Sequence, residues 1–63
     1  MFKTYLKEKD IPVCPKCNKK MVLDDVDVKF KGNQDEWWIC ESCYYSLIFK
    51  IRYGKIWKNE KVI

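Results

Sequence analysis

The sequence predicts a small all-β fold that needs support beyond its own hydrophobic core. Three observations lead to this prediction: the chain has 63 residues, several short segments alternate apolar and polar side chains, and there are four cysteines but no histidine. A single core below roughly 70–80 residues rarely supplies more than about 3–5 kcal/mol of stability. We therefore expect one domain over residues 1–63, with the cysteines as the additional source of stability.

The first twelve residues are expected to form an N-terminal arm or a short helix. Phe2, Tyr5 and Leu6 stand at helical spacing. The Ile11-Pro12 step should end any helix, because the residue before a proline is pushed out of the α region.

Two antiparallel hairpins are expected to follow. Apolar and charged residues alternate over residues 21–31, which predicts a strand. Residues 32–34 have turn chemistry, and residues 36–39 are expected to return as a short strand. A third strand is expected over residues 44–53, a turn at Gly54 and a fourth strand over residues 55–58. One face of the third strand is expected to carry Tyr45, Leu47, Phe49, Ile51 and Tyr53.

The cysteines form two pairs, each with two residues between its members. The pairs are Cys14-Pro15-Lys16-Cys17 and Cys40-Glu41-Ser42-Cys43, and the first hairpin would bring them together. Two such turns that face each other place four thiolates around one ion, with metal–sulfur bonds near ~2.3 Å. We expect one structural Zn²⁺ per chain, bound by Cys14, Cys17, Cys40 and Cys43.

This cysteine pattern resembles the zinc ribbon family over residues 13–49, and Cys14-Pro15-Lys16-Cys17 is similar to the first zinc knuckle of that family. The resemblance implies two zinc knuckles joined by antiparallel β-hairpins. The zinc-binding core would span residues 13–49, and a C-terminal β segment residues 50–63. Glycine often follows the second cysteine of each family knuckle, whereas Asn18 and Tyr44 stand there in this chain.

Other uses of the cysteines are less favoured. A rubredoxin-like iron site has similar paired cysteines. A redox CxxC is expected inside a βαβ pattern, which is absent here. Disulfides would require export, but residues 1–12 lack the apolar stretch of a signal peptide, so we expect a cytoplasmic, reducing location. A catalytic zinc is disfavoured because four protein ligands leave no position for water.

The composition favours a binding protein over an enzyme. The absence of histidine excludes imidazole-based acid–base and nucleophilic catalysis. The net charge is +4, with basic residues concentrated at both ends and acidic residues in the middle. Such asymmetry indicates a polyanionic partner. The candidate binding residues are two adjacent tryptophans and seven basic residues: Trp37, Trp38, Lys16, Lys19, Lys20, Lys50, Arg52, Lys55 and Lys58.

The expected partner is nucleic acid or a nucleic-acid-processing complex, in transcription, translation or a related process. The alternative is a protein–protein adaptor that docks through the Trp37/Trp38 strand. A third hypothesis rests on Asp35-Glu36, which resembles the acidic pair of transcript-cleavage zinc ribbons and would make the chain an enzyme accessory. No membrane or small-molecule partner is expected, and the oligomeric state stays open, since residues 56–63 could form a pairing edge.

Overall fold

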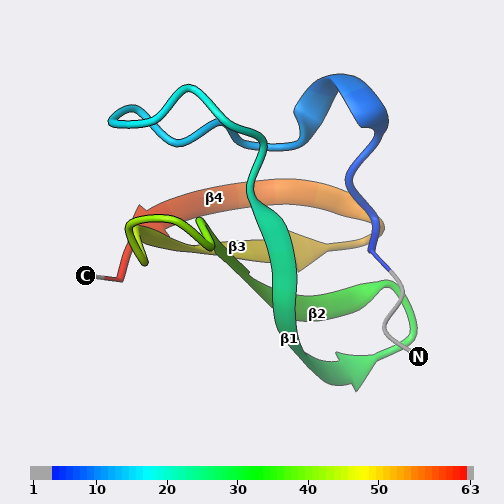
Figure 1. The fold of residues 1–63 in the computed structure, drawn as a ribbon. Coiled ribbons are helices and arrows are strands. Elements are labelled where there is room, and N and C mark those ends of the chain that lie inside the picture. The colour runs from blue at the N-terminus through cyan, green and yellow to red at the C-terminus, as the bar shows by residue number, and fades with distance from the viewer. Residues whose placement is uncertain (1–3, 63) are drawn as a thin grey trace.

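A four-stranded antiparallel sheet dominates the computed structural model, which describes residues 4–62. The strands follow one another as a meander, so β1 and β4 are the two edges (Figure 1). Their bounds are β1 Val22–Phe30, β2 Asn33–Ile39, β3 Ser46–Arg52 and β4 Lys55–Lys61. This arrangement confirms the small all-β class.

The segment before β1 crosses one face of the sheet and contains only a short 3-10 helix, η1 (Glu8–Asp10) (Figure 1). The helix expected around Tyr5 and Leu6 is not formed, and Phe2 lies outside the described residues. A long-range hydrogen bond takes the place of a helical one, since the Tyr5 N–H donates to the Glu36 carboxylate of β2 at 2.9 Å. Residues 4–62 contain no helix with the length and apolar character that a membrane crossing requires.

The strand bounds differ from those that the sequence predicts, because β2 and β4 are longer than expected and β1 and β3 are shorter. The first reversal needs only Lys31 and Gly32, whose φ is +82°, so β2 already begins at Asn33. The fourth strand continues three residues past Lys58, to Lys61. The third strand ends at Arg52, so Tyr53 occupies the second turn and is 88% exposed instead of lying on the core face.

The core lies between the sheet and the segment before β1. The strand register places Trp38 of β2 opposite Leu47 of β3. Phe49 and Ile51 follow Leu47 at intervals of two residues, so they lie on the same side of the sheet, and both are buried. We call this side the covered face. The buried residues that complete the core come from the first segment and the cysteine turns: Leu6, Cys14, Met21 and Cys40. No described helix or strand packs on the opposite side, which we call the open face.

The two hairpin turns lie side by side at the end of the sheet away from the cysteines. The Gly54 N–H donates to the Gly32 carbonyl at 2.7 Å, and the Tyr53 N–H donates to Asn33 Oδ1 at 3.2 Å. These bonds join the β1–β2 turn to the β3–β4 turn and hold the second hairpin in place.

Candidate metal centre and binding surface

Each cysteine pair sits on a turn with the same backbone pattern. The Asn18 N–H donates to the Cys14 carbonyl and the Tyr44 N–H to the Cys40 carbonyl, both at 2.8 Å. The first cysteine of each pair donates its own N–H to the carbonyl five residues on, at 2.9 and 2.8 Å. Asn18 and Tyr44 adopt φ of 58° and 61°, the left-handed conformation that glycine adopts without strain. Tyr44 therefore leaves the second turn equivalent to the first.

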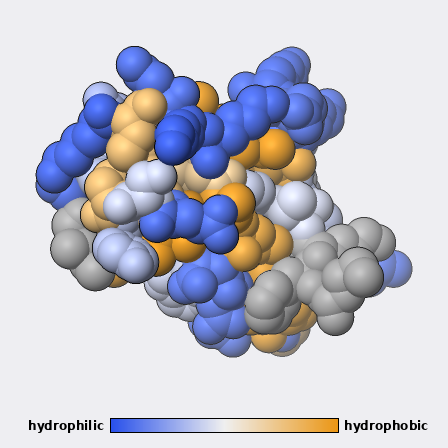
Figure 2. Space-filling view, in the orientation of Figure 1, coloured by the Kyte–Doolittle hydropathy of each residue, from blue (hydrophilic) through white to orange (hydrophobic). Residues whose placement is uncertain are grey.

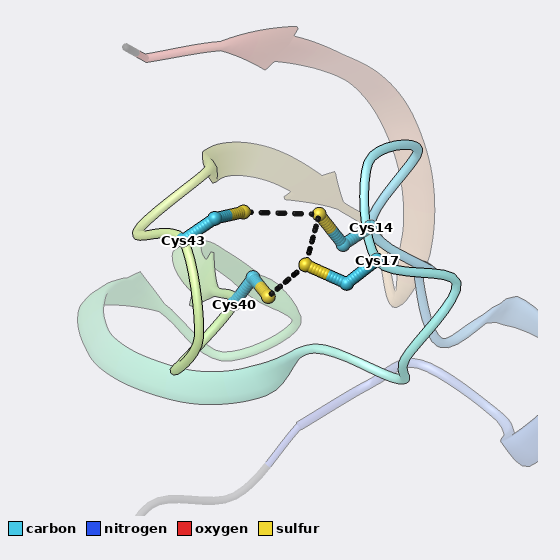
Figure 3. A group of neighbouring side chains, drawn as sticks. All are labelled: Cys14, Cys17, Cys40 and Cys43. Atoms are coloured by element: carbon cyan, nitrogen blue, oxygen red, sulfur yellow. Dashed lines mark hydrogen bonds between the residues drawn. The ribbon is translucent and has the colours of Figure 1, made fainter.

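The four thiols converge on one point between the two turns (Figure 3). The Sγ atoms of Cys14, Cys17, Cys40 and Cys43 all lie within 4.8 Å of one another. Three of the separations are 3.7 Å for Cys14–Cys17, 3.3 Å for Cys14–Cys43 and 3.6 Å for Cys17–Cys40. A tetrahedral ion with sulfur ligands at ~2.3 Å requires sulfur–sulfur distances of about 3.8 Å. The donor set and its spacing therefore fit a metal ion with four thiolate ligands.

The backbone around the sulfurs stabilises negative charge unevenly. Burial raises the pKa of Cys14, but hydrogen bonds from the Cys17 N–H and the Cys43 thiol bring it down to about 6. The Cys43 N–H likewise lowers the pKa of Cys40. Hydrogen bonds to the sulfurs of Cys43 and Cys40 hold a proton on Cys17 and raise its pKa to about 12. At neutral pH a divalent cation would complete the ionisation by displacing the remaining protons.

These features define a small all-β protein with a four-cysteine cluster that could bind a metal and is compatible with a zinc ribbon. Compared with known proteins, the chain matches no family model, no curated protein and no solved structure. The class therefore rests on the geometry of the cysteines and of the sheet.

Relieving the backbone strain at Tyr44 is expected to stabilise the metal-loaded protein. A non-glycine residue at this φ destabilises the folded state by roughly 1–2 kcal/mol through strain. Glycine removes that strain but costs about 0.5–1 kcal/mol of stability, because it gives the unfolded chain more conformational entropy. The Tyr44 side chain is 68% exposed, so few contacts are lost. Tyr44→Gly should therefore add about 0.5–1 kcal/mol in urea unfolding, and Asn18→Gly less, because asparagine tolerates the left-handed region. An equal gain at both positions would contradict this explanation.

The predicted basic residues separate into two groups. The first group lies beside the four-cysteine cluster, at the end of the molecule that we call the metal end. Lys16, Lys19 and Lys20 are exposed on or just after the first cysteine turn. Lys20 forms an ion pair with Glu8 of η1 at 2.6 Å. Lys19 Nζ donates to Ser42 Oγ of the second cysteine turn at 3.5 Å, so it links the two turns.

The second basic group lies on the β3–β4 hairpin. Lys50 pairs with Glu60 at 3.5 Å, and Arg52 pairs with an aspartate of β2 at 3.2 Å. Both partners reduce the charge available to a ligand. Lys55 and Lys58 are exposed, and neither forms an ion pair within residues 4–62. Among the predicted binding residues of this hairpin, Lys55 and Lys58 are therefore the two whose charge no described carboxylate neutralises.

The two adjacent tryptophans of β2 point to opposite sides of the sheet. Trp38 lies on the covered face with 4% exposure and donates its indole N–H to Glu36 at 3.2 Å. It is a core residue, so it is removed from the candidate binding surface. Trp37 lies on the open face opposite Ile48 and is half-buried.

The acidic pair of the third hypothesis is buried in the middle of β2. Glu36 has 0% exposure on the covered face, and Asp35 has 8% exposure on the open face, where it pairs with Arg52 and Lys29. The hairpin tip is formed by Lys31-Gly32 instead. The accessory hypothesis is therefore wrong about the placement of this pair, because Glu36 is fully buried and Asp35 is largely buried and paired with two cations.

Sequence reasoning missed the exposed aromatic residues at the turn end of the sheet. Trp57 is 61% exposed, Phe30 is 75% exposed and Tyr53 is 88% exposed. Figure 2 shows hydrophobic residues at the surface between hydrophilic ones on the side in view, so apolar exposure is not confined to these three residues. Two signals could have identified Tyr53 and Trp57: a Tyr-Gly turn, and an Ile-Trp pair on an otherwise polar strand.

Proposed function

We propose that the protein is a structural-zinc β module that binds nucleic acid, acting in transcription, translation or a related process. The observation that carries the proposal is the positive charge of the β3–β4 hairpin, which contains five basic residues and one acidic residue over residues 46–61. Cationic surfaces of this kind supply phosphate contacts.

Zinc fits the role of a structural ion. Four thiolates form the closed ligand set typical of structural zinc sites, and such a set has no open position for a substrate or water. Its function would then be to hold the two cysteine turns and the core together, while the surface does the binding. Free thiols persist in reducing compartments, which is where we infer that the protein acts.

Neutralising Lys55 and Lys58 of the hairpin is expected to weaken binding to every nucleic acid. Metal-loaded protein would be titrated by tryptophan fluorescence with single-stranded and duplex DNA and RNA at several salt concentrations. On single strands the logarithm of the binding constant should fall with log salt by about 0.7 per phosphate contact. Replacing Lys55 and Lys58 by glutamine should reduce this slope by about 1–2 units.

The matched control neutralises two lysines at the metal end, Lys16 and Lys19, and should change the slope less. If no nucleic acid binds at low salt, the proposal fails and the protein-adaptor function becomes the better explanation. Binding that survives high salt unchanged would also contradict a phosphate-based interaction.

A further inference from the structure

A shallow pocket lies at the turn end of the β3–β4 hairpin, remote from the metal centre. Its volume is about 440 Å³, and it is lined by Arg52, Tyr53, Lys55, Ile56 and Trp57. Both aromatic side chains of this pocket are largely exposed, so they contribute little to the core.

A β-bulge directs Trp57 to the surface. In the strand register, Lys50 of β3 lies opposite Lys58 of β4, and the next residue, Ile51, lies opposite Ile56. Two residues along β4 therefore correspond to one residue along β3. Trp57 falls between the two pairs and has no partner on β3. Bulges re-aim side chains and are frequent beside functional sites. The bulge therefore presents an indole that a regular edge strand would not place there.

Tyr53 adopts a left-handed backbone conformation that is unfavourable for tyrosine. Tyr53 and Gly54 have φ of 56° and 74°, the pattern of a two-residue turn that favours asparagine followed by glycine. Tyrosine in this position is strained, and its side chain is 88% exposed. Strain of this kind concentrates at binding sites, and here it places a second aromatic ring beside the pocket.

Cations surround the Trp57 ring. The Arg52 guanidinium lies 5.6 Å and the Lys58 ammonium 4.9 Å from the ring centroid. Arg52 is fixed by bonds to Asp35 at 3.2 Å and to the Ile51 carbonyl at 2.7 Å, whereas Lys58 is exposed and can move to a ligand. An aromatic platform beside mobile cations suits a flat ring that carries a nearby negative charge.

We propose that this pocket binds an unpaired nucleotide of a single-stranded nucleic acid, a proposal that rests on the function proposed above. The base stacks on Trp57 beside Tyr53, and the adjoining phosphates contact Lys55 and Lys58. Stacking needs an exposed face of the base, which a single strand offers and a duplex hides. The protein therefore binds single strands more tightly than duplexes of equal charge.

The test compares Trp57→Ala with Tyr44→Ala, a matched change of another exposed aromatic residue at the metal end. Metal-loaded protein is titrated with a fluorescently labelled oligothymidylate of about ten nucleotides and with an abasic strand of equal length. Trp57→Ala is expected to weaken oligothymidylate binding by roughly 5- to 100-fold with an unchanged salt slope. Tyr44→Ala should bind like the parent protein. The parent should bind the abasic strand about as weakly as Trp57→Ala does.

A second variant separates binding from folding. Tyr53→Asn relieves the turn strain, so it should raise the urea midpoint while it weakens oligothymidylate binding. If the parent protein binds no nucleic acid at all, the proposed function itself fails. If the parent binds and the Lys55/Lys58 variant binds less, but Trp57→Ala and Tyr53→Asn bind like the parent, the function stands and the pocket is not the nucleotide site. Equal losses for Trp57→Ala and Tyr44→Ala would overturn it as well.

Discussion

Replacing Cys40 with serine is expected to unfold the protein. Cys40 is 1% exposed and lies in both the core and the four-thiol cluster. A structural zinc contributes an apparent ~10–16 kcal/mol, whereas a core of this size supplies about 3–5 kcal/mol. The loss of one ligand should therefore abolish the β signal in circular dichroism and the dispersion of the NMR spectrum.

The control for this experiment is Glu41→Ser, which changes an exposed residue of the same turn and should leave the spectrum and the metal content unchanged. Elemental analysis of the parent protein should give one zinc per chain. Acid should release the metal, because protons compete for the thiolates as the pH falls. A chelated protein that keeps a dispersed spectrum, or a chain that contains iron, would contradict the proposal.

The four-cysteine cluster was predictable because its signal is local. Two residues between the cysteines of each pair suffice to place both sulfurs on one turn, and the intervening hairpin requires only an alternating pattern. The four strands were predictable for the same reason. Their ends were not, since a single glycine at positive φ made the first turn shorter than the three residues that the composition indicates.

Features that depend on strand pairing were not predictable. Alternation shows that Trp37 and Trp38 face opposite sides, but only the cover provided by the first segment decides that Trp38 is the buried one. The exposure of Trp57 depends on a bulge between β3 and β4, which is a property of the register and not of either strand alone. The conformation of the segment before β1 depends on a hydrogen bond from the Tyr5 N–H to the Glu36 carboxylate, which is distant in the sequence. The helical spacing of its apolar residues was therefore misleading.

That carboxylate, Glu36, is a fully buried acceptor for four donors. Its Oε1 accepts from the Thr4 hydroxyl and from the Trp38 indole, the latter at 3.2 Å. Its Oε2 accepts from the Tyr5 N–H at 2.9 Å and from Gln34 Nε2 at 2.7 Å. Glu36 therefore joins the first segment to the covered face at a point where apolar packing alone would leave donors unsatisfied.

Glu36→Leu is expected to destabilise the metal-loaded protein by about 4 kcal/mol or more, because it removes the acceptor of four donors and each buried donor that loses its acceptor costs roughly 1–3 kcal/mol. Glu36→Gln should cost less, since it keeps one acceptor oxygen. Urea unfolding measures both. Hydrogen exchange at the Tyr5 amide should accelerate in both variants, which reports the local bond. Glu60→Gln, which removes the same charge from a surface ion pair, should change stability by less than about 1 kcal/mol.

A double-mutant cycle separates the hydrogen bonds of Glu36 from its packing. Trp38→Phe removes the indole N–H while it keeps most of the aromatic ring in the core. In the Glu36→Leu background that N–H has no acceptor, so its removal should recover part of the lost stability. The double variant should therefore be more stable than the sum of the single effects predicts, by about 1 kcal/mol or more. Strictly additive losses would show that Glu36 stabilises the fold through its volume and not through the bond to Trp38.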